Sequence, residues 1–74
     1  MKTKYIKIES LTDLSEFVIE ASKVDGDVLI YRGKYCIDGK SMLGIMSIDI
    51  SDRCKIEYPE DAIEFEKFIK QFEI

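Results

Sequence analysis

The sequence of 74 residues contains no histidine and no tryptophan, and it has a single proline. The absence of histidine excludes any chemistry that depends on an imidazole as acid, base, metal ligand or phosphoryl acceptor. No apolar run approaches the ~20 residues needed to span a membrane, and the amino-terminal stretch MKTKYIKIES lacks the apolar core of a secretory signal. We therefore expect a cytoplasmic protein with no membrane association.

Cysteine is also scarce, and basic residues are outnumbered. Cys36 and Cys54 lie far apart in strand-like segments, without the close spacing of a redox or zinc motif. Ordinary buried or half-buried thiols are the simplest interpretation, and a disulfide or a reactive thiol is the alternative. The net charge of −4 argues against a nucleic-acid partner, because binding phosphates requires a concentrated basic face. Nothing in the sequence indicates a metal or a cofactor.

The overall composition is that of an ordinary folded domain, with 46% hydrophobic and 35% charged residues. A chain of this length forms one domain, residues 1–74, and is too small to enclose a deep substrate cavity between domains. We therefore expect a carrier, adaptor or binding protein and not an enzyme.

Hydrophobic periodicity indicates four strands and three helices. Ile6 and Ile8 alternate with polar residues, as in a half-buried strand. Ser10 or Thr12 can cap a helix whose apolar positions recur at helical spacing up to Asp25-Gly26. The remaining elements are a hairpin of residues 28–32 and 35–38 around Gly33-Lys34, a short helix over 41–48, a strand over 54–58 and a helix from Glu60 onward.

This order, β-α-β-β-α-β-α, predicts an α+β fold, an open-faced sandwich in which a four-stranded antiparallel sheet carries helices on one face. Alternation places six side chains toward the helices: Ile6, Ile8, Val28, Ile30, Cys54 and Ile56. The outer face then receives Lys7, Leu29, Tyr31, Lys55 and Glu57. Leu29 and Tyr31 form a small apolar patch there, which is either ordinary surface or a weak dimer contact, so we expect a monomer or a weak dimer. On the last helix, Glu66 and Lys70 have the spacing of an ion pair.

The stretch Gly39-Lys40-Ser41 looks like half of a phosphate-binding loop. Such a loop needs a glycine five residues earlier, but Lys34 occupies that position, and Gly33 is out of register. We therefore do not expect a nucleotide site. Instead, we expect Gly39 to allow a sharp turn out of the hairpin and Lys40 to lie beside the Ser41 hydroxyl, where Ser41 caps the short helix.

The short helix after Ser41 is unusually apolar. Ile45 and Ile48 can face the core while Met42, Leu43 and Met46 lie toward the other side. Methionine-rich exposed surfaces suit docking to more than one protein, because the side chain is flexible and polarizable. These three residues are therefore a predicted docking site, and the alternative is that all five belong to the core.

A family resemblance rests on this part of the chain. The run EFVIEASKVDGDVLIYRGKYCIDGKSMLGIMSIDI, residues 16–50, resembles HPr, the histidine-containing phosphocarrier of the bacterial sugar phosphotransferase system. The segment GKSMLGIMSI resembles the regulatory segment of that family. The resemblance implies partner docking through the short helix. It also implies phosphorylation of Ser41 by an HPr kinase and recognition of the phosphoserine by a catabolite-control regulator. Plain helix capping remains the alternative role of Ser41.

The chain departs from the family where HPr carries its active-site histidine. HPr has a Gly-Leu-His-Ala-Arg-Pro type motif in that loop, whereas this chain reads IESLTDLSEF. Ser10 and Thr12 would form phosphate esters too stable to pass on, and Asp13 is the one conceivable acceptor. The sequence thus predicts a non-catalytic, HPr-like regulatory or adaptor protein. The alternatives are a carrier with a non-histidine acceptor and a scaffold unrelated to sugar transport.

Overall fold

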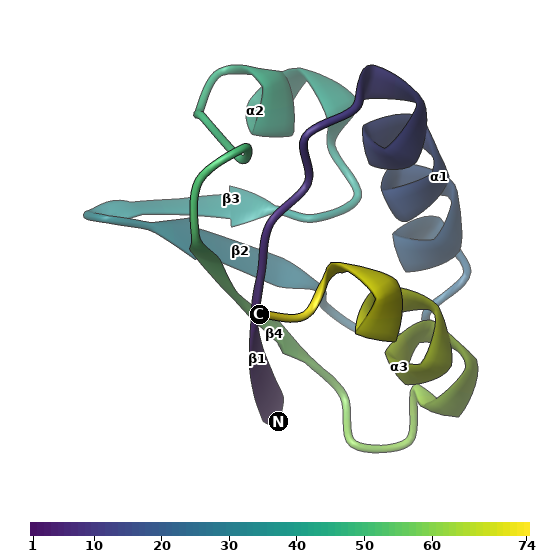
Figure 1. The fold of residues 1–74 in the computed structure, drawn as a ribbon. Helices are drawn as coiled ribbons and strands as arrows, with labels where there is room; N and C mark the ends of the chain where they lie inside the picture. The colour runs from purple at the N-terminus through teal and green to yellow at the C-terminus, as the bar shows by residue number, and fades with distance from the viewer.

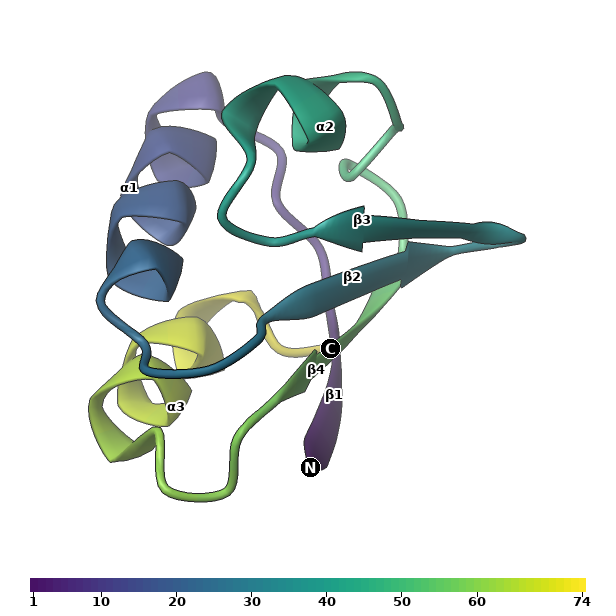
Figure 2. The same cartoon turned by 180° about the vertical axis from the view of Figure 1, so that it is seen from behind.

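The computed structural model describes residues 1–74 and consists of one four-stranded antiparallel sheet with three helices. The strands are β1 (Lys2–Ile6), β2 (Leu29–Arg32), β3 (Tyr35–Asp38) and β4 (Cys54–Tyr58), in the spatial order β1-β4-β2-β3. The helices are α1 (Leu11–Ser22), α2 (Met42–Met46) and α3 (Ile63–Ile69), which a 3₁₀ turn (Lys70–Phe72) extends. The helices lie on one side of the sheet, so the predicted open-faced sandwich and its element order are confirmed (Figures 1 and 2).

The core lies between the sheet and the helices, and it follows the alternation of the strands. All six residues predicted to point toward the helices are buried, among a cluster of 15 buried hydrophobic residues. On the outer face, Leu29, Tyr31, Lys55 and Glu57 are partly buried and Lys7 is exposed. None of the helices has the length and apolar character needed to cross a membrane.

Element boundaries differ from the sequence expectation by about three residues at three places: β1 runs over Lys2–Ile6, α1 ends at Ser22 before Asp25-Gly26, and α3 begins at Ile63 and not at Glu60. Ile8 lies beyond the strand but is still buried, and its N–H donates to the Ile50 carbonyl at 3.1 Å. Ser10, and not Thr12, caps α1 by accepting the Asp13 N–H at 3.2 Å. The predicted strand over 54–58 is confirmed without change.

The β2–β3 hairpin turns through Gly33 and Lys34. Gly33 has φ +59°, whereas the φ of Lys34 is not positive. A positive φ at the first central position alone is typical of a type II′ turn, which matches the twist of the two strands. The hairpin fixes the point from which the chain enters α2.

The expected ion pair between Glu66 and Lys70 is wrong. The Glu66 carboxylate instead accepts a hydrogen bond from the buried Tyr58 hydroxyl at 2.7 Å and lies 3.0 Å from the Lys2 ammonium. The Tyr58 hydrogen bond, followed by Lys2, lowers the pKa of Glu66, and burial raises the pKa of Tyr58. These contacts connect α3 to β4 and β1. Glu66 is therefore paired with residues of the sheet and not with Lys70.

Candidate functional site

The chain enters α2 through a close backbone contact at Gly39. The Gly39 N–H donates to the Val28 carbonyl at 2.7 Å, and a Cβ on Gly39 would lie 2.7 Å from Val28 Cγ1. The chain turns at Gly39 and Lys40, where the Ser41 N–H donates to the Asp38 carbonyl, so the predicted turn is confirmed, although the φ of Gly39 is not positive. Glycine is required because only a residue without a side chain fits against Val28.

Ser41 is the N-cap of α2. Its Oγ accepts the Gly44 N–H at 3.1 Å, and its backbone N–H donates to the Asp38 carbonyl at 3.0 Å. The residue is partly buried. The capping role predicted from the sequence is therefore present, and the regulatory role stays a prediction.

Lys40 does not lie where the sequence predicts. Its ammonium donates to the Val24 carbonyl, just beyond the end of α1, at 2.9 Å, and its backbone N–H donates to Asp38 Oδ1 at 2.9 Å. The positive charge is therefore engaged with the end of α1 and not with the Ser41 hydroxyl.

Two of the three predicted docking residues point into solvent. Leu43 is 84% exposed and Met46 is 56% exposed, whereas Ile45 is fully buried. Met42 is partly buried and packs against the core. The prediction that Met42 lies on the exposed side with Leu43 and Met46 is therefore wrong, because Met42 packs between α2 and the core. Gly44 lets α2 approach β3, because a Cβ there would lie 2.9 Å from Ile37 Cγ2.

A shallow apolar hollow of about 240 Å³ separates α2 from the loop between β1 and α1. Seven of the eleven residues that line it are hydrophobic, and Met46 and Leu11 are among them. Leu11 is 64% exposed, and sequence reasoning missed it. A signal was present, because Leu11 is an apolar residue at the first position of α1, directly after the N-cap. We call Leu11, Leu43, Met46 and the hollow the docking surface.

The loop before α1 leads to Asp13, a lone carboxylate in the first turn of that helix. Asp13 is partly buried and forms no ion pair, and its backbone N–H donates to the Ser10 hydroxyl. The structure contains no group of three or more cysteine, aspartate or glutamate side chains that could hold a metal ion. Aspartyl-phosphate chemistry normally needs such a group beside the acceptor, so nothing around Asp13 favours that alternative.

The two cysteines have different surroundings, and neither is in a disulfide. Cys54 is buried, and burial raises the pKa of its thiol. Cys36 is exposed on the edge strand β3, so the expectation of a buried or half-buried thiol is wrong there. Cys36 is paired across the sheet with Tyr31. Hydrogen bonding to Glu57, and then to Cys36, raises the pKa of Tyr31 to about 12.

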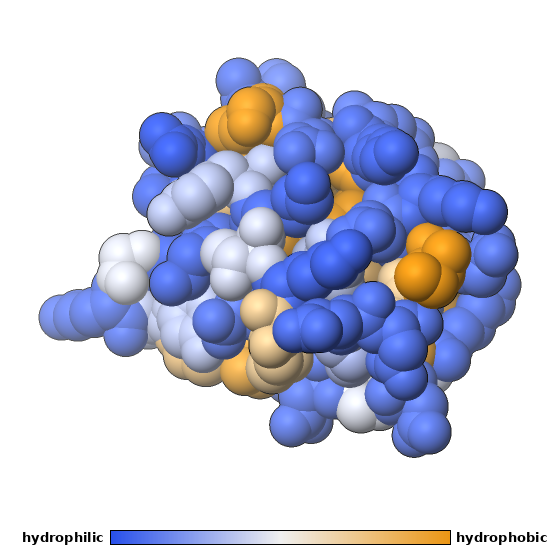
Figure 3. All heavy atoms as spheres, turned by 90° about the horizontal axis from the view of Figure 1, so that it is seen from below, coloured by the Kyte–Doolittle hydropathy of each residue, from blue (hydrophilic) through white to orange (hydrophobic).

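The outer sheet face is less apolar than the sequence suggests. The Tyr31 hydroxyl donates to Glu57 at 2.8 Å, and the Lys55 ammonium lies 4.8 Å from the centre of the Tyr31 ring. The face of the molecule opposite α2 is mostly hydrophilic, with hydrophobic residues in small separate groups (Figure 3). Such scattered residues are normal on a protein surface. The weak dimer contact stays a prediction.

No protein-family model matches the chain, and no curated protein matches it in sequence. Solved structures do match. HPr-C-His from Thermoanaerobacter tengcongensis superposes with a TM-score of 0.80 at 25% identity, over 96% of this chain and 89% of that one. The phosphocarrier protein HPr from Bacillus anthracis gives 0.73 at 24% identity, over 96% and 95%. A histidine-containing phosphocarrier protein described for Mycoplasma gives 0.70 at 22% identity, over 95% and 86%.

These similarities extend over nearly the whole length of both partners. They agree with the resemblance seen in residues 16–50, and they extend it to the strands and helices at both ends of the chain. The absence of histidine distinguishes this sequence from a protein described as histidine-containing. The chain therefore has the fold of HPr phosphocarrier proteins and is similar to them over nearly its whole length.

Proposed function

We propose that this chain is an HPr-like protein of the phosphotransferase system that does not itself carry the phosphoryl group and acts by docking other proteins through α2. The observation that carries the proposal is an exposed apolar surface in a chain without histidine. Leu43 and Met46 are exposed beside an apolar hollow, although a domain of this size has few apolar residues to spare from its core.

Loss of the carrier step follows from the chemistry of the loop before α1. A phosphoramidate on imidazole has the transfer potential that a carrier needs, and the chain has no imidazole. Ser10 and Thr12 would give stable esters, and Asp13 belongs to no acidic cluster that could hold a metal ion. The docking role remains, because it depends only on the apolar surface.

We further propose that phosphorylation of Ser41 regulates docking, with an HPr kinase and a catabolite-control regulator as the partner classes. Phosphorylation adds about two negative charges and three acceptor oxygens. On Ser41 these oxygens would meet the backbone N–H groups of the first turn of α2, which includes Leu43. The added charge therefore changes the surface that a partner contacts without requiring the fold to change.

The carrier step is tested by incubating the protein with phosphoenolpyruvate and the general enzyme of the phosphotransferase system, and then measuring its intact mass. We expect no added phosphoryl group, while the HPr of Bacillus anthracis, treated in parallel, should gain one. An acid-labile adduct that passes to a sugar-specific acceptor would contradict the proposal.

The Ser41 switch is tested with a bifunctional HPr kinase. We expect one phosphoryl group, mapped by fragmentation to Ser41 and absent from Ser41→Ala. Ser47→Ala is the matched control, since Ser47 ends the same helix and its hydroxyl donates to the Gly44 carbonyl. If the kinase leaves the protein unmodified, or modifies the Ser41→Ala protein equally, Ser41 acts only as a cap.

A further inference from the structure

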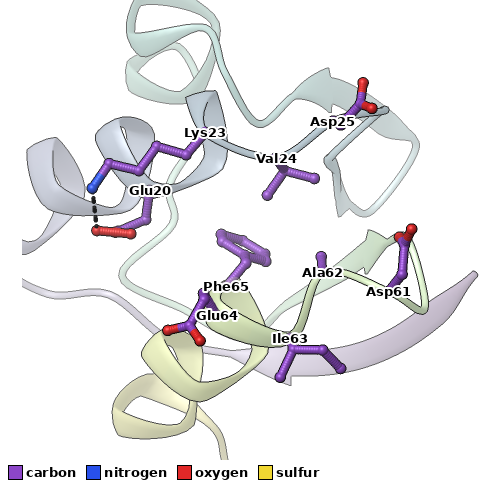
Figure 4. A pocket seen from close by; sticks show the side chains of 9 residues that line it. All are labelled: Glu20, Lys23, Val24, Asp25, Asp61, Ala62, Ile63, Glu64 and Phe65. Atoms are coloured by element: carbon purple, nitrogen blue, oxygen red, sulfur yellow. Dashed lines mark hydrogen bonds and ion pairs between the residues drawn. The ribbon is translucent and has the colours of Figure 1, made fainter.

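A second groove lies at the opposite end of α1 from the docking surface, where α1 ends and α3 begins (Figure 4). Its volume is about 260 Å³. Val24 and Ala62 face each other across it, and the Phe65 ring lies between the two helices at its base (Figure 4). Ile63, which is 52% exposed, forms one side. The inside of the groove is therefore apolar.

The rim of this groove is strongly acidic. Four carboxylates lie on it, from Glu20, Asp25, Asp61 and Glu64, against the single ammonium of Lys23. Lys23 is already paired with Glu20 at 3.0 Å. Asp25 and Asp61 are exposed, lie at the same end of the groove and form no ion pair or side-chain hydrogen bond (Figure 4). Their charges are therefore available to a ligand.

An apolar inside with an acidic rim selects the chemistry of the occupant. Anions are repelled, and the backbone N–H groups at the start of α3 already have Glu64 and Glu66 in their first turn. The volume lies below the roughly 300–1,000 Å³ of sites for drug-sized molecules, so it suits a single side chain. Lysine and arginine combine an apolar stem with a cationic end, and so match both features of the groove.

We propose that this groove binds a lysine or arginine side chain from a basic segment of a protein partner. The methylene stem packs on Val24 and Ile63, and the cationic end lies between the carboxylates of Asp25 and Asp61. Because the groove and the docking surface lie at opposite ends of α1, one partner can occupy the groove while α2 remains free, or one partner can contact both.

The test uses the full chain labelled with ¹⁵N and the peptide acetyl-Ala-Leu-Arg-Leu-Ala-amide, followed by nuclear magnetic resonance. We expect the peptide to shift the backbone amides of Val24, Ala62 and Phe65. Replacing the peptide arginine by glutamine should weaken binding about fivefold, the effect expected for exposed ion pairs. The double variant Asp25→Asn/Asp61→Asn should weaken binding of the arginine peptide by a similar factor.

The matched control is Glu16→Gln/Glu73→Gln, which removes the same charge from exposed residues that line neither the groove nor the hollow beside α2. This variant should bind the arginine peptide like the unmodified protein. Thermal unfolding of each variant establishes that the fold is kept. Equal binding of the arginine and glutamine peptides, unchanged binding by the Asp25→Asn/Asp61→Asn protein, or shifts confined to α2 would each overturn the proposal.

Discussion

Replacing Leu43 and Met46 by glutamine should weaken docking while leaving the fold intact, whereas adding Met42→Gln should destabilise the protein further. Glutamine is chosen because its helix propensity is close to that of leucine and methionine, so the helix itself is not penalised. The contrast tests directly which of the three predicted docking residues belong to the surface.

The expected free energies follow from the exposed fractions. Burying a whole leucine or methionine side chain is worth about 1.5–3 kcal/mol, and Leu43 has only a small part of its side chain buried. Met46 is about half exposed. The Leu43→Gln/Met46→Gln protein should therefore lose about 1 kcal/mol of unfolding free energy. Met42 packs against the core, so its replacement should cost about 2 kcal/mol more.

Urea unfolding, followed by circular dichroism, measures these changes. In parallel, titration of the general enzyme of the phosphotransferase system into each ¹⁵N-labelled variant measures docking, which we expect to weaken at least about tenfold, or 1.4 kcal/mol. If Leu43→Gln/Met46→Gln lost about 3 kcal/mol or more, these residues would be core. If it kept full affinity for a partner that binds the unmodified protein, α2 would not be the docking site.

Three further predictions concern the elements around the site. Gly39→Ala should cost about 1–3 kcal/mol through the clash with Val28, and less in a Val28→Ala background, as measured by urea unfolding. Ser41→Ala should cost about 1 kcal/mol, a fall in melting temperature of about 4–8 °C, whereas Ser41→Asp, which can still cap α2, should cost less. The pKa of Glu66 is lower in the folded protein than in the unfolded chain. The Glu66 carboxylate therefore stabilises the fold at pH values above its unfolded pKa, and this stabilisation is lost as the pH falls through its pKa in the folded protein. The free energy of unfolding should therefore change less between neutral and acidic pH in Glu66→Gln than in the unmodified protein. An unchanged pH dependence would show that contact with Tyr58 and Lys2 does not lower the pKa of Glu66.

The fold could be predicted from the sequence because its signals are local. In β4, the alternating residues Cys54, Ile56 and Tyr58 are all buried, as the period of a strand requires. Lys55 and Glu57 lie between them on the outer face. The resemblance in residues 16–50 then selects one topology among those that the element order allows.

The details of the site could not be predicted in the same way, because they depend on partners far away in the sequence. The Lys40 ammonium donates to the Val24 carbonyl, and Glu66 pairs with Lys2. The partners in each pair are far apart in the sequence, so no local pattern predicts that they meet. The sequence places Met42 on the surface because a helix of five residues is too short for its period to separate a partly buried side chain from an exposed one.

The hydrogen bond from Lys40 to Val24 joins the two surfaces described above. Lys40 directly precedes Ser41, and Val24 lines the groove between α1 and α3. A phosphate on Ser41 would attract the Lys40 ammonium and weaken the hydrogen bond from Lys40 to the Val24 carbonyl. Thermodynamic linkage then requires the converse, so that a ligand in the groove changes the free energy of placing a negative charge on Ser41 by the same amount. If Ser41 is phosphorylated and the groove is occupied as proposed, Lys40 would couple the two events through its hydrogen bond to Val24.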